Sequence, residues 1–210
     1  MRLYYSPGAC SLAPHIALRE ADRTFELERV DLRSHLTAHG IDYLTINPKG
    51  YVPALELDSA LVLTENAAIL QFIGDLVPAR KLVPPNGTFA RYHLQEWLSF
   101  IGSEVHKQFG PLFHPDTPAF TQATLRSKIG ERFGYLSTVL VDRAYLLGES
   151  FSVADAYLFA VLRWTERFEI DLQIWPNLDD YYQRILPRPT VEAALAAEGL
   201  LEHKKLRRSA

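Results

Sequence analysis

The stretch Tyr5-Ser6-Pro7-Gly8-Ala9-Cys10-Ser11 joins a short apolar opening to a run of residues that is typical of a helix. Pro-Gly marks a turn, and Pro14 is tolerated in a first helical turn, where its missing N–H needs no partner. Cys10, the only cysteine, therefore lies at or just before a helix N-terminus. The free N–H groups and the dipole of such a terminus favour a thiolate, whereas the usual fate of a lone cysteine is burial as a small hydrophobe. From this stretch alone, we weigh a reactive and a structural Cys10 equally.

The residues around this stretch predict a strand, a helix and a second strand. Residues 2–5 have the pattern of the first strand and residues 11–21 that of the helix. Residues 25–32 alternate apolar and polar side chains, which is typical of a half-buried strand. A strand–helix–strand unit implies that its two strands are parallel.

The residues that follow predict a hairpin and a second helix. A short helical turn covers residues 42–50 and ends at Pro and Gly. Two apolar runs, 51–57 and 61–63, are separated by a connection of hairpin length. The next helix continues to residue 76, and Thr64 is its expected N-cap.

The pattern changes after residue 76. Residues 77–87 are rich in proline and break every period, which indicates a linker. No strand is predicted after residue 88, and helical patterns cover residues 88–114, 118–142, 152–169, 177–186 and 189–199. We therefore predict an α/β domain at residues 1–80, a linker at 81–87 and an all-α domain at 88–210. Ser152 and Asp155 have the spacing of a capping box at the start of one of these helices.

The composition is that of a globular protein, with 48% hydrophobic and 22% charged residues, and a net charge of -3 gives no reason to expect a nucleic-acid partner. The basic cluster His203-Lys-Lys-Leu-Arg-Arg208 is short and terminal, as in a solvated tail. One cysteine cannot form an internal disulfide, which fits a reducing compartment. Because neither a signal peptide nor a membrane span is visible, we expect a cytoplasmic protein without a membrane partner. No histidine and cysteine cluster has ligand spacing, so no metal is expected.

The sequence resembles a glutathione S-transferase, specifically the bacterial beta class. The resemblance is carried, in the family's order and spacing, by the stretches Tyr4-Tyr-Ser-Pro-Gly-Ala-Cys-Ser-Leu-Ala-Pro-His15, Asn47-Pro-Lys-Gly-Tyr-Val-Pro-Ala-Leu55, Leu63-Thr-Glu-Asn-Ala-Ala-Ile69, Glu104-Val-His-Lys107 and Phe151-Ser-Val-Ala-Asp-Ala-Tyr-Leu158. It implies a thioredoxin-like N-terminal domain, an all-helical C-terminal domain and a homodimer. It also implies a detoxifying transfer of glutathione, the co-substrate, to small hydrophobic electrophiles.

The resemblance assigns several residues to glutathione. It implies a cis bond at Val52-Pro53, where the residues alone favour trans, and the Val52 backbone would then pair with the cysteinyl part of glutathione like an added strand. Glu65 and Asn66 open a helix whose free N–H groups suit the γ-glutamyl carboxylate, although the spacing alone is better explained by simple capping through Thr64. His35 faces the glycine carboxylate in this interpretation, or is an exposed loop histidine. Two residues depart from the family: His35 replaces a frequent Lys, and Asn66 replaces a frequent Ser or Gly.

The long helix predicted at 88–114 contributes a second group of candidate site residues. Helical spacing puts Ser99, Ser103, His106, Gly110 and Phe113 on one mixed face. A lone histidine is more often structural than catalytic, but the resemblance makes His106 a partner of the glutathione sulfur beside Cys10. It also brings Ser99, Ser103 and Lys107 near glutathione and lets Glu104 reach the ligand of the other subunit.

An electrophile pocket is the last implied feature. The resemblance implies that it is lined by Tyr5, Phe109, Phe113 and Trp164. Tyr157, Val161, Trp164 and Phe168 form a helical stripe, which usually means core packing.

These residues support one leading function and two alternatives. Donors at Cys10 and His106 would stabilise the glutathione thiolate, which then attacks the electrophile. The first alternative is a glutathione-dependent thiol–disulfide reductase, in which Cys10 forms a mixed disulfide. The second is a binding protein that has the fold without the catalysis.

Overall fold

The computed structural model describes residues 1–201, so the basic cluster at 203–208 lies outside the described residues. One five-stranded sheet has the order β3-β2-β1-β4-β5. Its strands are β1 (Arg2–Tyr5), β2 (Glu26–Asp31), β3 (Leu36–Thr37), β4 (Ala54–Glu56) and β5 (Val62–Thr64). β1 is parallel to β2 and antiparallel to β4, and β4 and β5 form the predicted hairpin. This mixed sheet confirms the thioredoxin-like prediction. The sequence pattern missed only the two-residue strand β3.

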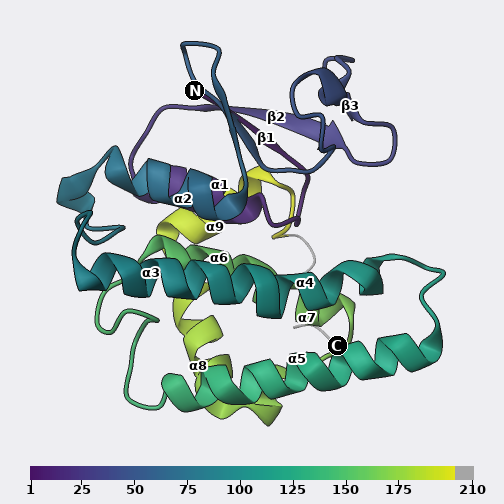
Figure 1. The fold of residues 1–210 in the computed structure, drawn as a ribbon, viewed down its shortest axis with the longest axis vertical. Coiled ribbons are helices and arrows are strands. Elements are labelled where there is room, and N and C mark those ends of the chain that lie inside the picture. The colour runs from purple at the N-terminus through teal and green to yellow at the C-terminus, as the bar shows by residue number, and fades with distance from the viewer. Residues whose placement is uncertain (202–210) are drawn as a thin grey trace.

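Helices make up the rest of the described chain (Figure 1). They are α1 (Leu12–Glu20), α2 (Asn66–Asp75), α3 (Phe89–Phe100), α4 (Lys107–Phe109), α5 (Ala119–Val139), α6 (Val153–Leu162), α7 (Trp164–Arg167), α8 (Pro176–Ile185) and α9 (Pro189–Ala197). Short 3-10 turns cover Tyr43–Thr45, Pro78–Arg80, Gly110–Phe113 and Leu172–Ile174. The described residues contain no strand after residue 88, as predicted, and no helix that is long and apolar enough to cross a membrane.

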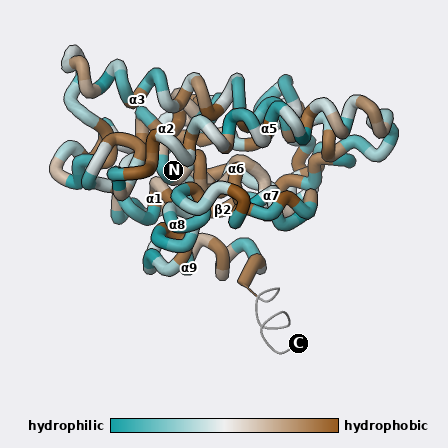
Figure 2. The backbone as a smooth tube through the Cα atoms, turned by 90° about the horizontal axis from the view of Figure 1, so that it is seen from below, coloured by the Kyte–Doolittle hydropathy of each residue, from teal (hydrophilic) through white to brown (hydrophobic). Residues whose placement is uncertain are grey.

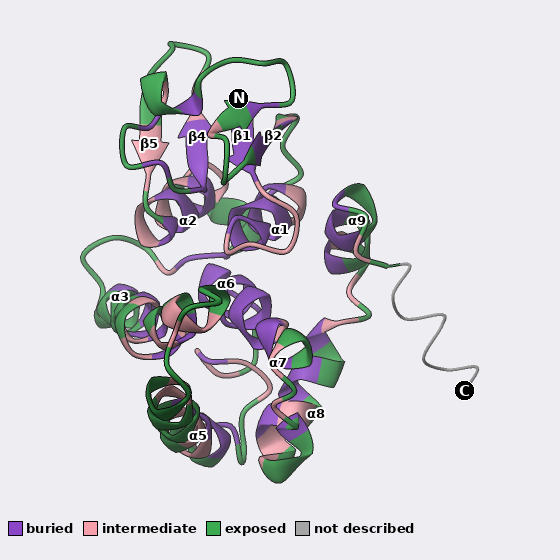
Figure 3. Ribbon diagram, turned by 90° about the vertical axis from the view of Figure 1, so that its right-hand side faces the viewer, coloured by how far each residue is buried: buried purple, intermediate pink, exposed green. Residues whose placement is uncertain are grey.

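Helix α1 joins the two halves of the molecule. All seven residues from Leu12 to Leu18 are buried, including His15. The reason is that α1 packs against α2 beneath the sheet and against α6 and α9 of the helical half (Figure 3). One apolar core therefore runs from β1 through α1 into α6 and α9.

Helix α6 forms the centre of the helical half, and every residue of it is buried. A helix that is apolar on all sides is expected in the middle of a bundle rather than on its surface. Its start is the predicted capping box, because Asp155 accepts the Ser152 N–H at 2.8 Å. In contrast, hydrophilic turns recur along α3 and α5 at one edge of the molecule (Figure 2).

The predicted linker is packed against both halves. Leu82 and Val83 are buried, and the Leu82 carbonyl accepts the N–H of Val153 at the start of α6. Beside them, the buried guanidinium of Arg91 binds both carboxylate oxygens of Asp75 at 2.8 Å. The prolines of this segment interrupt the helical pattern, but the segment is still packed against both halves of the molecule. The division of the chain at residues 81–87 stays a prediction.

Two helix boundaries differ from the expected ones. The helix predicted at 88–114 is interrupted by a π-helical segment, Ile101–His106, so the side chains there no longer follow the α-helical spacing used in the prediction. Helix α2 begins at Asn66 with Glu65 at its N-cap, whereas Thr64 is the last residue of β5. The expected N-cap role of Thr64 was therefore wrong by one residue.

Candidate functional site

Cys10 lies two residues before α1 and is largely covered. Its thiol donates to the Val52 carbonyl at 3.3 Å. Burial is the largest effect on its ionisation and raises the pKa of Cys10 to about 12, although nearby N–H groups and the Asn66 amide lower it. Desolvation thus outweighs the helix terminus. The free protein therefore favours a neutral Cys10 thiol, and the role of Cys10 as a donor to the glutathione sulfur stays a prediction.

The Val52-Pro53 peptide bond is cis, as the resemblance implied. The Val52 side chain is buried, and its carbonyl faces the Cys10 thiol. Its backbone N–H makes no hydrogen bond with any residue from 1 to 201. The Val52 N–H is thus a free donor, and the Val52 carbonyl is bound only by a thiol. An extended peptide could pair with these two groups of Val52 in the way that a strand is added to the edge of a sheet.

The start of α2 carries Glu65 and Asn66. Glu65 has φ of 74°, which is unusual for a residue with a side chain and is typical of functional sites. Its exposed carboxylate pairs with Lys49. Asn66 is buried, and its side-chain amide donates to the Cys10 carbonyl at 3.1 Å, while its Oδ1 has no partner in the described chain. The two residues therefore offer an exposed acid and, beside Cys10, a buried unpaired acceptor.

His35 lies across the loop from these residues. A Cβ atom on Gly50 would come within 2.9 Å of the His35 ring, so the ring packs directly against the backbone before Tyr51. The Nδ1 atom of His35 is buried and has no partner among residues 1–201. A buried, unpaired ring nitrogen is unlike that of an exposed loop histidine, and a contact of His35 with the glycine carboxylate of glutathione stays a prediction.

His106 is the last residue of the π-helical segment, a type of irregularity that is frequent at functional sites. Its Nδ1 atom lies 2.8 Å from the hydroxyl of Tyr157 on α6. Burial lowers the pKa of His106 to about 4, so the ring is neutral at pH 7. The histidine is consequently a hydrogen-bonding group and not a cation.

One path of contacts links the Cys10 loop to His106. The indole N–H of Trp164 donates to the Gly8 carbonyl at 2.8 Å, and the Trp164 ring meets His106 edge to face. The action of Cys10 and His106 on one sulfur stays a prediction.

The loop that carries Cys10 is also held from the C-terminal end, which the sequence pattern did not indicate. Gly8 has φ of 72°, a conformation that glycine adopts freely. Its N–H donates to the buried carboxylate of Glu198 at 2.9 Å, and the same carboxylate binds Nδ1 of His15 at 2.8 Å. Glu198 lies 190 residues from Gly8 in the chain, so no local pattern could reveal the contact.

The remaining polar residues assigned to glutathione are more open. Ser99, Ser103 and Lys107 are exposed, and none of them makes a side-chain hydrogen bond within residues 1–201. Glu104 pairs with Arg132 of its own chain at 2.8 Å. A reach of Glu104 towards another subunit therefore requires that this pair open or be shared.

Aromatic side chains form one wall of the site. Trp164 contacts Phe109, Phe113 and His106, all edge to face. Phe113 is 38% exposed and Phe109 is fully buried, so Phe109 supports this wall from behind and does not line it. Tyr5 is also buried and packs against His15. Of the four predicted pocket residues, Phe113 is the exposed one, whereas Trp164 is buried, as are Tyr5 and Phe109.

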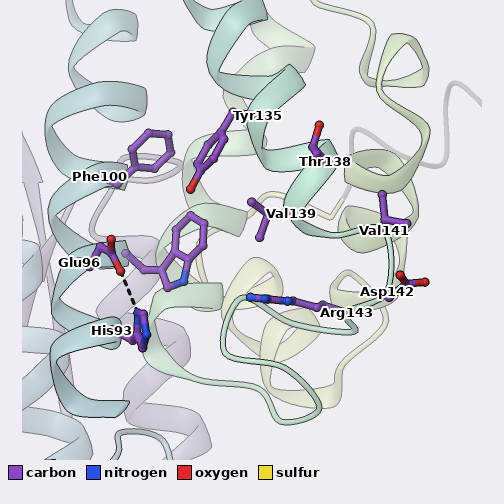
Figure 4. A pocket seen from close by; sticks show the side chains of 10 residues that line it. His93, Glu96, Phe100, Tyr135, Thr138, Val139, Val141, Asp142 and Arg143 are labelled. Atoms are coloured by element: carbon purple, nitrogen blue, oxygen red, sulfur yellow. Dashed lines mark hydrogen bonds and ion pairs between the residues drawn. The ribbon is translucent and has the colours of Figure 1, made fainter. Parts of the chain in front are cut away.

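A cavity of about 630 Å³ lies away from these groups, between α3 and α5. Phe100, Tyr135 and Val139 line it, and His93 and Glu96 are paired at its rim (Figure 4). Chemistry at Cys10 cannot use this cavity. Within residues 1–201, no three histidine, cysteine, aspartate or glutamate side chains gather in a way that could hold a metal ion.

Comparison with known proteins identifies the family. The N-terminal domain model of glutathione S-transferases matches residues 8–76, and the C-terminal domain model matches residues 100–189. Glutathione S-transferase GstA of Escherichia coli O157:H7 is 46% identical over 95% of this chain and all of its own. The beta class glutathione S-transferase of Sphingomonas chungbukensis is 49% identical, with a TM-score of 0.93 over 96% of this chain and 100% of its own. A sphingomonad glutathione S-transferase complexed with glutathione is also 49% identical, with a TM-score of 0.92 over 95% of this chain and 100% of its own. The chain belongs to the glutathione S-transferase family, in its bacterial beta class.

Proposed function

We propose that the protein is an enzyme that conjugates glutathione to small hydrophobic electrophiles. The observation that carries the proposal is the meeting of neutral donors from two domains: the Cys10 thiol beside the free Val52 edge, and the neutral ring of His106 beside Trp164. Neutral donors suit a reaction whose nucleophile is a bound thiolate, because they stabilise the anion without having to ionise first.

Glutathione binds in this proposal along the edge next to Pro53. The cysteinyl backbone pairs with the free N–H of Val52, and the γ-glutamyl end reaches Glu65 and the unpaired Oδ1 of Asn66. The glycine carboxylate lies near His35 and Lys49. This arrangement puts the glutathione sulfur beside the Cys10 thiol.

Catalysis then consists of keeping that sulfur ionised. A free thiol has a pKa of about 8.5, so only a few per cent is thiolate at neutral pH. Hydrogen bonds from Cys10 and from His106 lower this pKa because they favour the charged form. The thiolate attacks the electrophilic carbon, a C–S bond forms and the leaving group departs with its electron pair, while Phe113 and Trp164 provide the apolar wall.

The two alternatives are less well supported. A reductase needs Cys10 itself as a thiolate, and burial that raises the pKa of Cys10 to about 12 leaves very little thiolate for exchange. A protein that only binds glutathione would not need hydrogen-bond donors from both Cys10 and His106 at the sulfur. We also propose that the enzyme works in the cytoplasm, in detoxification, and needs no metal.

A chlorodinitrobenzene conjugation assay with the purified protein tests the proposal. We expect glutathione-dependent turnover that saturates with glutathione and produces the thioether. Disulfide reduction without conjugation would favour the reductase. Glutathione binding without either reaction would favour the binding protein, and both of these results would contradict the proposed function.

We further propose that the protein is a homodimer. Support comes from the family and from exposed aromatic side chains on α3 and α5: Phe89 and Tyr92 on α3, and Tyr135 on α5, which lines the cavity between these helices. A second copy of the chain is the occupant we propose, because apolar patches of this kind mark interfaces. Sedimentation at micromolar concentration should give twice the 23.8 kDa mass of the chain. A single species at 23.8 kDa would contradict the dimer.

A further inference from the structure

We propose that a hydrogen bond from the Tyr157 hydroxyl to Nδ1 of His106, a relay from α6 to the site, holds His106 in one tautomer, with the proton on Nε2. Tyr157 is then a positioning residue: it touches His106 and not the reacting sulfur. The inference rests on the proposed transferase function for its purpose, but its geometry stands on side chains of the free protein.

The contact between Tyr157 and His106 is close and enclosed. The hydroxyl lies 2.8 Å from Nδ1, and the two rings meet edge to face with their centres 5.8 Å apart. Tyr157 is only 4% exposed and projects from α6, the rigid central helix. A hydroxyl in such a place needs its hydrogen-bond partners inside the protein.

The direction of the hydrogen bond follows from the donors and acceptors present. A tyrosine hydroxyl has one hydrogen to donate, and within residues 1–201 Nδ1 of His106 is its only acceptor. The Oδ1 atom of Asn66 does not take it, because that atom has no partner. The hydroxyl therefore donates to Nδ1.

This direction decides what His106 offers to the site. The neutral imidazole carries one proton, and when Nδ1 is an acceptor the proton is on Nε2. The Nε2 atom makes no hydrogen bond within residues 1–201 and is not closed off from solvent. It is therefore the free ring donor for the glutathione sulfur. Burial supports the neutral state, because it lowers the pKa of His106 to about 4.

Nuclear magnetic resonance of the free protein, labelled with 15N in its histidines, tests the relay without any need for activity. The His106 signals are identified by their loss in His106→Asn. In the wild type we expect Nδ1 to have the shift of an unprotonated acceptor and Nε2 that of an N–H donor. A protonated Nδ1 in the folded wild type overturns the proposal, whatever the variants do.

Tyr157→Phe removes the hydroxyl and keeps the ring. We expect a mixture of the two His106 tautomers, a conjugation rate lower by about 2- to 13-fold, as for the loss of one neutral hydrogen bond, and ionisation of bound glutathione at higher pH. Tyr182→Phe is the matched control, because Tyr182 is also 4% exposed and its hydroxyl contacts Glu166, away from the site. The control should leave the tautomer, the rate and the ionisation unchanged.

The outcomes separate this inference from the proposed function. An Nε2–H tautomer in an inactive wild type supports the relay and contradicts the transferase. Conjugation with the same single tautomer in wild type and Tyr157→Phe supports the transferase and overturns the relay.

Discussion

Replacement of Asp155 by alanine should lower the free energy of unfolding by about 3 kcal/mol or more, because several buried donors would lose their acceptor at about 1–3 kcal/mol each. The carboxylate accepts the N–H groups of Leu146 and Ser152 and the hydroxyls of Ser152 and Tyr181, at 2.8 to 3.0 Å. It is completely buried. Alanine leaves these donors unpaired in an apolar interior at the start of α6. Urea unfolding with tryptophan fluorescence measures the change.

Asp171→Ala is the matched control for this prediction. Asp171 also caps a helical turn, but it accepts one N–H, from Gln173 at 3.0 Å, at an exposed site. Its loss should cost about 0.5–1 kcal/mol. The Michaelis constant for glutathione of folded Asp155→Ala protein should stay close to that of the wild type. Equal stability of the two variants would contradict the central role of Asp155.

The second large effect is expected on the rate of conjugation. His106→Ala should reduce conjugation by about 5- to 150-fold, the effect of one hydrogen bond to a charged group. Cys10→Ala should weaken conjugation less, because its thiol is one donor beside the nucleophile and already binds the Val52 carbonyl. It should also abolish any mixed disulfide between the protein and glutathione, which mass spectrometry detects. His93→Ala, which removes an exposed histidine on α3, is the control that should leave conjugation unchanged.

The pH dependence of conjugation follows from the same two groups. Burial raises the pKa of Cys10 to about 12 and lowers that of His106 to about 4, so neither titrates between pH 5 and 9. The rate should therefore rise with pH through one ionisation, that of bound glutathione. Loss of a donor destabilises the thiolate and moves this ionisation to higher pH. A second inflection near pH 6.5 that disappears in His106→Ala would contradict a neutral His106.

The local patterns of the sequence predict most of the fold. Alternation over residues 25–32, the hairpin around residue 60 and the spacing of Ser152 and Asp155 each depend on neighbours in the chain, and the structure contains β2, the β4–β5 pair and the capping box. The apolar run of α6 indicates burial in the same way. Boundaries were less certain, since Glu65 with its positive φ replaces Thr64 as the N-cap of α2.

The site depends on contacts that no local pattern contains. Gly8 is hydrogen-bonded to Glu198 and to Trp164, and His106 is hydrogen-bonded to Tyr157. The partners in these contacts lie 51 to 190 positions apart in the chain. The π-helical segment before His106 interrupts an otherwise regular helical period. The neutral state of Cys10 results from burial, which is a property of the folded chain and outweighs the helix terminus that the sequence showed.

The central claim is that Cys10 and His106 act on one sulfur, and the ionisation of bound glutathione tests it most directly. The ultraviolet absorbance of the thiolate is followed against pH in complexes of glutathione with wild type, Cys10→Ala and His106→Ala. We predict that the thiolate forms at a lower pH in the wild type than in free glutathione, and at a higher pH in both variants than in the wild type. The same ionisation pH in all three complexes would contradict the shared sulfur and leave Cys10 and His106 with structural roles only.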